Sequence, residues 1–107
     1  MSDLAARHCK PLEGHAAMSA ADIAANLREA EGWSLISGAI EKTFRFADFH
    51  RTMAFVNAVA WIAHREDHHP DTSFGYDRCT LRFNTHSVGG ISINDFICVA
   101  KVEALVA

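Results

Sequence analysis

Residues 68–86 read HHPDTSFGYDRCTLRFNTH and contain a change from helix to strand. Pro70 bounds the helix before them, because the residue before a proline is pushed out of the α region. From position 79 to 84, apolar and polar residues alternate strictly, which is typical of a strand with one buried face. With Asp77-Arg78 as a two-residue turn, the segment predicts a β-hairpin.

This turn would determine which side chains of the hairpin face one another. It pairs Phe74 with Leu81 and, farther along, His69 with His86. Directly opposed residues have β-carbons about 4.5–5.5 Å apart, so the two imidazoles would lie together on the polar face. Side chains of the other face are expected in the core, namely Phe74, Tyr76, Leu81 and Phe83.

Regular patterns on the N-terminal side predict a helix and a second hairpin. Ser19 and Asp22 have the spacing of a capping box, and apolar residues then recur at helical spacing until Gly32 ends the helix. Residues on both sides of Ser37-Gly38 alternate between apolar and polar, which predicts two antiparallel strands joined by a tight turn.

The longest predicted helix begins after Asp48 and ends before Pro70. Two apolar stripes run along it, so the helix can pack on the sheet and also on another subunit. The stripes consist of Phe49, Met53, Val56, Ala60 and Ala63, and of Phe55, Val59 and Ile62. A final helix follows Gly89-Gly90, where Ser92 and Asp95 repeat the capping-box spacing.

The element order α-β-β-α-β-β-α predicts an α+β fold, in which a four-stranded antiparallel sheet has three helices packed on one face. Residues 1–17 show no period, and we expect them to form a loose N-terminal leader in which His8 and Cys9 are incidental. The remaining residues, 18–107, are expected to form a single domain.

Composition excludes several classes of protein. The chain has 107 residues, of which 50% are hydrophobic and 21% charged, as in an ordinary globular domain. A net charge of −3 with scattered Lys and Arg offers no face for nucleic acid and no basic patch for a membrane. A membrane-spanning helix needs about 18 consecutive apolar residues, and no apolar run in the sequence is nearly that long. No secretion signal is visible either. Three widely spaced cysteines fit neither a disulfide framework nor a metal knuckle, so we expect a cytoplasmic protein.

Four of the seven histidines lie close together in the sequence, at positions 64, 68, 69 and 86. Histidine titrates near neutral pH without help, so such a cluster at a helix-to-strand corner suits proton transfer. A structural role stays open for each single histidine, as a helix cap or a dipole partner. Asp95 can equally serve only its capping box, and Trp33 and Tyr76 only the core.

A zinc site is the competing interpretation, because His64 and His68 are four residues apart. A zinc-protease motif, however, needs Glu directly after the first histidine. Here Arg65 stands at that position, and Glu66 follows one place too late. The sequence also lacks the GxSxG, P-loop and GxGxxG patterns. Catalysis without a metal or nucleotide cofactor is therefore expected.

A set of residues at fixed gaps resembles the signature of the pterin-4a-carbinolamine dehydratases. It consists of His68-His69-Pro70, Tyr76, Thr85-His86, Gly90, Ser92 and Asp95. The resemblance runs from about Ser19 to Val106 and includes Gly32-Trp33. It implies a hydro-lyase that converts 4a-hydroxytetrahydropterin to quinonoid dihydropterin and thereby recycles the cofactor of aromatic amino-acid hydroxylases.

The resemblance also implies roles for individual residues. His68 and His86 match the acid/base positions of the family, and His69 matches a position that binds and orients the substrate, so we group these three as catalytic. Asp95 would orient His86 or contact the pterin. The implied substrate-binding residues are Trp33, His64, Pro70, Thr85 and Asp95.

Two positions depart from the family pattern. His64 stands where the family often has Glu, and Thr72 where it often has an aromatic residue. The missing carboxylate would weaken pterin binding or alter the pH profile, although His64 could substitute as a hydrogen-bonding group. The family further implies homodimers or homotetramers. The alternative function is a non-enzymatic dehydratase-like module that acts as a protein assembly or dimerisation factor.

Overall fold

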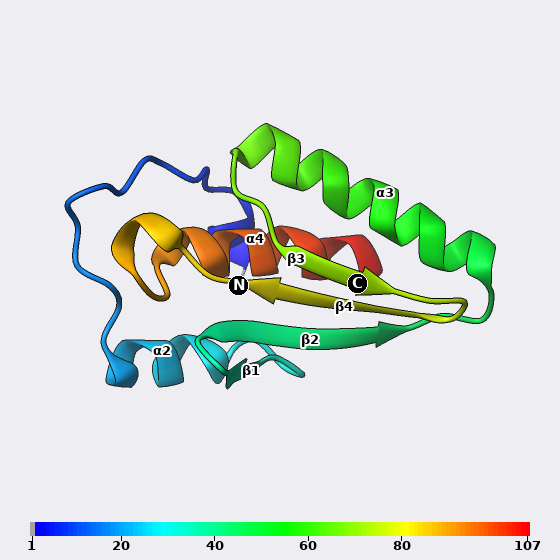
Figure 1. Ribbon diagram of the computed structural model, residues 1–107, viewed down its shortest axis with the longest axis horizontal. Coiled ribbons are helices and arrows are strands. Elements are labelled where there is room, and N and C mark those ends of the chain that lie inside the picture. The colour runs from blue at the N-terminus through cyan, green and yellow to red at the C-terminus, as the bar shows by residue number, and fades with distance from the viewer. Residues whose placement is uncertain (1) are drawn as a thin grey trace.

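The structure is a computed structural model that describes residues 2–107. Within these residues it contains four α-helices, one short 3-10 helix and four strands (Figure 1). In chain order they are α1 (Ser2–Ala5), α2 (Ala20–Leu27), β1 (Ser34–Ile36), β2 (Ala39–Arg45), α3 (Phe49–Glu66), β3 (Asp71–Phe74), β4 (Arg78–Phe83), the 3-10 helix η1 (His86–Val88) and α4 (Ile93–Val106). The order is the predicted one, with α1 as an additional helix.

The four strands form one antiparallel sheet in the order β1-β2-β4-β3. β2 and β4 lie in the middle and bury one face of the sheet through Ile40, Phe44, Cys79, Leu81 and Phe83. Figure 1 shows α4 behind the strands and α3 running beside β3. The predicted α+β fold, a four-stranded antiparallel sheet with helices, is therefore confirmed.

The first hairpin has the predicted turn between β1 and β2. Ser37 and Gly38 both have positive φ angles, 49° and 81°, as a type I′ turn requires. Leu35 pairs with Ile40 on either side of it. The turn residues alone are sufficient to specify this register, because few other residue pairs tolerate two positive φ angles in succession.

The second hairpin turns one residue earlier than predicted. Phe74 pairs with Cys79 instead of Leu81, so Tyr76 and Asp77 occupy the turn. Phe74 and Tyr76 are also not core residues, since 44% and 65% of their surfaces are exposed. The reason is that β3 is the edge strand, and each of its four residues is exposed.

Two tertiary hydrogen bonds explain the position of this turn. Thr52 Oγ1 of α3 lies 2.9 Å from the Tyr76 carbonyl and shares its proton with the Asp48 carbonyl at the same distance. The Phe46 N–H donates to the Asp77 carbonyl at 2.8 Å. Both bonds come from parts of the chain remote in sequence. They hold the turn on Tyr76 and Asp77, so local turn propensity does not decide the register.

The long helix α3 buries the second of its two predicted apolar stripes. Phe55 and Val59 of that stripe are buried, together with Ala63. In contrast, Phe49 and Ala60 of the first stripe are exposed. Two members of the first stripe are therefore uncovered on the single chain, whereas Val56 packs against the core and Ala63 is buried.

The additional helix α1 packs on α4 at the far end of the chain. Lys101 Nζ donates to the Ala5 carbonyl at 2.8 Å, and Leu4 packs against the hydrophobic core. Four residues are too few to show a helical period, so the sequence pattern does not predict this helix. We predicted a leader over residues 1–17 and a domain over residues 18–107, and this division stays a prediction. Met1 lies outside the described residues.

Along residues 2–107, none of the helices combines the length and the apolar character needed to cross a lipid bilayer.

Candidate active site

His68 and Asp95 form the centre of the site. His68 follows α3, where Asp67 ends the helix in a left-handed conformation with φ 50°, and Asp95 lies in the first turn of α4. His68 Nε2 and Asp95 Oδ1 are 2.6 Å apart. The Asp95 side chain is 0% exposed and that of His68 12% exposed. The carboxylate is thus covered, and only the imidazole reaches toward solvent.

Two further groups bind the Asp95 carboxylate. Its Oδ2 accepts hydrogen bonds from Thr85 Oγ1 at 2.8 Å and from the Ser92 N–H at 2.9 Å. The Ser92 hydroxyl donates to Thr85 Oγ1 at 2.6 Å and accepts from the Asn94 N–H at 3.1 Å. Because an ionised carboxylate only accepts hydrogen bonds, His68 donates its Nε2 proton to Asp95. In this tautomer the Nδ1 atom of the ring keeps its lone pair.

The His68 ring is also supported by the core. It stacks on Phe83 of β4, with the ring centroids 6.1 Å apart and the ring planes 11° apart. Phe83 is itself buried in the middle of the sheet. A ring held by a buried carboxylate and a buried aromatic side chain is preorganised for proton transfer, because little rotamer freedom is left to lose.

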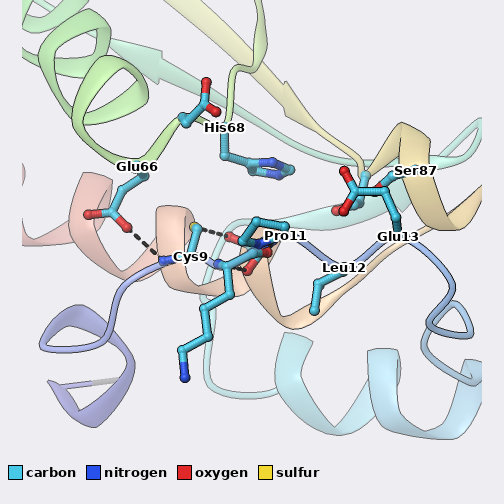
Figure 2. A pocket seen from close by; sticks show the side chains of 11 residues that line it. Cys9, Pro11, Leu12, Glu13, Glu66, His68 and Ser87 are labelled. Atoms are coloured by element: carbon cyan, nitrogen blue, oxygen red, sulfur yellow. Dashed lines mark hydrogen bonds between the residues drawn. The ribbon is translucent and has the colours of Figure 1, made fainter.

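A pocket of about 200 Å³ opens beside His68 (Figure 2). Its walls come from three parts of the chain. The leader contributes residues 9–13, the α3–β3 junction contributes residues 66–68, and the region around η1 and the start of α4 contributes Thr85, Ser87 and Asn94. The site therefore lies where the leader and the start of α4 meet the corner after α3.

Glu66 connects the leader to this corner. Its Oε1 accepts from the Cys9 N–H at 2.7 Å, and its Oε2 lies 2.9 Å from His8 Nδ1 and 3.7 Å from Lys101 Nζ. Burial raises the pKa of Glu66, but the hydrogen bonds from Cys9 and His8 and the charges of Lys101 and His8 outweigh it. The net pKa of Glu66 is lowered from its ordinary value. A buried anion therefore anchors the leader.

The predicted pairing of His69 with His86 is wrong. The β3–β4 ladder ends at Asp71 and Arg82, and His86 begins η1 beyond the end of β4. Both histidines are exposed. The cause is the turn one residue earlier, which moves every cross-strand partner. Asp95 correspondingly binds His68 and not His86.

The other predicted substrate-binding residues lie in different environments. Pro70 and His69 line a second pocket, of about 280 Å³, with residues of α3 and β3. Trp33 is buried in the core, where its Nε1 donates to Glu103 Oε2 at 3.0 Å. His64 is exposed on α3 with its ring centroid 5.5 Å from that of Trp61. Among the five predicted substrate-binding residues, Thr85 and Asp95 lie next to His68 in the structure.

The sequence patterns missed the leader and Glu66 as parts of the site. Residues 9–13 belong to a segment without any period, and His8 and Cys9 were expected to be incidental. The sequence did contain one indication that the leader is part of the site. Histidine, cysteine, lysine and glutamate occur close together in a short segment that forms no regular element.

Within residues 2–107, no group of three or more His, Cys, Asp or Glu side chains is arranged to hold a metal ion. The two histidines considered for zinc have other partners, since His68 binds Asp95 and His64 packs on Trp61.

Comparison with known proteins gives one consistent family. The profile of the family described as Pterin 4 alpha carbinolamine dehydratase matches residues 16–105. A Nitrosospira multiformis protein, named as a candidate pterin-4-alpha-carbinolamine dehydratase, is 49% identical over 106 residues, which cover 98% of this chain and 94% of that protein. A Xanthomonas campestris protein with the same name is 55% identical over 101 residues, covering 92% and 86% of the two chains.

The fold is likewise similar to that of a solved structure. A crystal structure described as a transcriptional coactivator/pterin dehydratase from Brucella melitensis matches with a TM-score of 0.82 and 28% sequence identity. The match covers 85% of this chain and 99% of that chain.

Proposed function

This chain belongs to the pterin-4a-carbinolamine dehydratase family, and we propose that it dehydrates a 4a-hydroxytetrahydropterin to the quinonoid dihydropterin by proton transfer through His68 and His86. Family membership makes it a hydro-lyase with a small-molecule pterin as substrate. The proposal concerns the histidine mechanism and the role of the reaction in recycling a tetrahydropterin cofactor.

One observation carries the proposal, namely the hydrogen bond of 2.6 Å between His68 Nε2 and the covered Asp95 carboxylate. Asp95 stabilises the imidazolium that forms when His68 Nδ1 takes a proton. Dehydration needs a proton for the departing 4a hydroxyl and a base for the proton of the ring nitrogen, and the products are water and quinonoid dihydropterin. A histidine with one nitrogen free at the pocket can serve either step.

The size of the pocket supports a compact substrate. About 200 Å³ beside His68 is less than the roughly 300–1,000 Å³ of pockets for drug-sized ligands. A bicyclic pterin ring is small, planar and rich in hydrogen-bonding atoms. Thr85, whose hydroxyl contacts Asp95, would then hold the carboxylate and not the substrate, which refines its role from binding to positioning.

His86 is the proposed second acid/base residue. It begins η1, and the residues on both sides of it, Thr85 and Ser87, line the pocket. His69 keeps its proposed role in binding and orienting the substrate. Its position with Pro70 in the neighbouring pocket suits contact with the part of the pterin that extends beyond the ring.

The test is a stopped assay of carbinolamine decay with wild type, His68→Ala and His86→Ala. We expect wild type to accelerate the decay and each variant to lose about 10²–10⁴-fold in rate, the usual contribution of a positioned acid/base group. His50→Ala is the matched control, because His50 is exposed in the first turn of α3, at the opposite end from His68. Wild type without any acceleration over buffer at micromolar concentration would rule out the enzyme hypothesis.

A second candidate is an assembly or dimerisation factor, alone or in addition to catalysis. It is favoured by the uncovered apolar stripe of α3, and the description of the Brucella melitensis relative includes the words transcriptional coactivator. We propose that this chain forms homodimers or homotetramers in the cytoplasm, where free thiols such as Cys9, Cys79 and Cys98 persist. The alternative predicts partner binding that survives His68→Ala and His86→Ala.

A further inference from the structure

We propose that the N-terminal leader forms the specificity wall of the active-site pocket, in which Glu13 binds the 2-amino edge of the pterin. This inference rests on the proposed dehydratase function. The family profile begins to match at residue 16, so residues 1–15 of the leader lie outside it. Nevertheless, residues 9–13 of the leader line the same pocket as His68.

Contacts on both sides of the pocket hold the leader in place. The Cys9 N–H donates to Glu66 Oε1 at 2.7 Å, and the Cys9 Sγ lies 3.7 Å from the Cys98 Sγ. Lys10 exchanges two hydrogen bonds with Asn94, from its N–H at 3.2 Å and to its carbonyl at 2.7 Å. Since Glu66 and Asn94 also line the pocket, the segment that follows Lys10 is positioned as a wall.

The geometry of the pterin ring decides what this wall must recognise. The 2-amino group lies directly across its six-membered ring from C4a, the carbon that loses water. When C4a faces His68, the 2-amino edge must therefore face away from it. That edge presents the N2 and N3 protons side by side, and a carboxylate can accept both at once in a bidentate arrangement.

Three carboxylates line the pocket, and two of them are unsuited to this task. Glu66 is buried, and both of its oxygens already contact leader groups. Asp67 directly precedes His68 in the chain and so belongs to the wall that holds the acid/base group. Glu13 is exposed. Figure 2 shows it on the opposite side of the pocket from Glu66, with its carboxylate turned toward His68.

The experiment compares two probes, 7,8-dihydropterin and 7,8-dihydrolumazine, which has oxygen in place of the 2-amino group. Equilibrium titrations of wild type should show at least tenfold preference for dihydropterin. Glu13→Gln should lose about tenfold in affinity for dihydropterin and keep or improve its affinity for dihydrolumazine, because a charge-assisted bidentate contact is lost. In the dehydration assay the same variant should raise KM about tenfold with kcat unchanged.

Two further variants make the result specific. Glu29→Gln makes the same change at an exposed residue outside the pocket lining, and should leave both affinities unchanged. Asp67→Asn tests the competing carboxylate. Preserved discrimination in Glu13→Gln, folded as judged by circular dichroism, would overturn the proposal, as would discrimination lost only in Asp67→Asn. If wild type neither catalyses dehydration nor binds dihydropterin, the proposed function fails and this inference fails with it.

Discussion

At the scale of single residues, the proposed acid/base role of His68 depends on its hydrogen bond to Asp95. Asp95 has two simultaneous tasks, because its Oδ2 completes the capping box of α4 while its Oδ1 binds the imidazole. From the sequence, Asp95 was expected either to serve only the capping box or to act in the site. The structure combines them, since the same cap that starts α4 also fixes the direction of the carboxylate.

Asp95→Asn tests this double role. The amide keeps the shape but presents an N–H group to donors, so His68 loses its acceptor or changes tautomer. We expect kcat for dehydration to fall by about 10² or more, with KM changed much less and the pH profile altered. Steady-state kinetics between pH 6 and 9 measure this. An unchanged kcat with an unchanged pH profile would show that Asp95 serves only the cap.

Glu66 predicts a pH-dependent contribution to stability. Its pKa in the folded protein lies below the ordinary value of 4.5. The stabilisation is therefore fully present above pH 4.5 and is lost as the pH falls through the folded pKa. Glu66→Gln should lower the free energy of unfolding by about 1–3 kcal/mol at pH 7, and the difference should shrink at pH 3.5.

Urea denaturation of both proteins at the two pH values measures the effect of Glu66. Glu29→Gln is the control, because Glu29 is exposed in the turn after α2. A difference between wild type and Glu66→Gln that is the same at pH 7 and pH 3.5 would contradict an ionic role for Glu66.

At the scale of elements, the two hairpins follow different rules. In the first, Ser37 and Gly38 specify the turn locally through their positive φ angles. In the second, the turn is held by hydrogen bonds from Thr52 of α3 and from Phe46, which directly follows β2. Sequence patterns predict a turn correctly only where the information is local.

Gly38→Ala tests the local rule. A side chain at φ 81° is strained, and open space around Gly38 leaves this strain as the only cost. We expect a loss of about 1–2 kcal/mol in the free energy of unfolding, measured by urea denaturation. Ser37→Asn is the companion change and should be neutral or stabilising, since Asn-Gly is the preferred type I′ pair. Equal stability of Gly38→Ala and wild type would contradict the turn assignment.

On the scale of the whole molecule, the single chain leaves an apolar surface exposed on α3. The candidate active-site pocket is lined by the leader of the same chain, and the exposed part of the α3 stripe is available to a second copy. Large apolar side chains exposed on α3 include Phe49 at 47% and Trp61 at 60%. Of these two, Phe49 belongs to the first stripe, and we propose that the exposed part of this stripe is an interaction surface.

Ala60→Glu tests self-association through α3. Ala60 is an exposed member of the first stripe, and glutamate is a good helix former, so the fold of the monomer should be unaffected. We expect wild type to have the mass of a dimer or tetramer and Ala60→Glu a smaller mass, as measured by light scattering after gel filtration. Ala24→Glu on α2 is the matched control. A monomeric wild type, or no change in mass for Ala60→Glu, would refute this interface.

The sequence by itself determined whatever depends on neighbours along the chain: the helix caps at Asp48 and Ser92, the turn at Ser37-Gly38 and the alternation that makes β4 a strand. Tertiary structure alone decided the register of the second hairpin, the partner of His68 and the place of the leader. The physical reason is that these features depend on hydrogen bonds between residues far apart in sequence. The bond from His68 spans 27 positions, and that from Cys9 to Glu66 spans 57. Periodicity carries no information about such contacts.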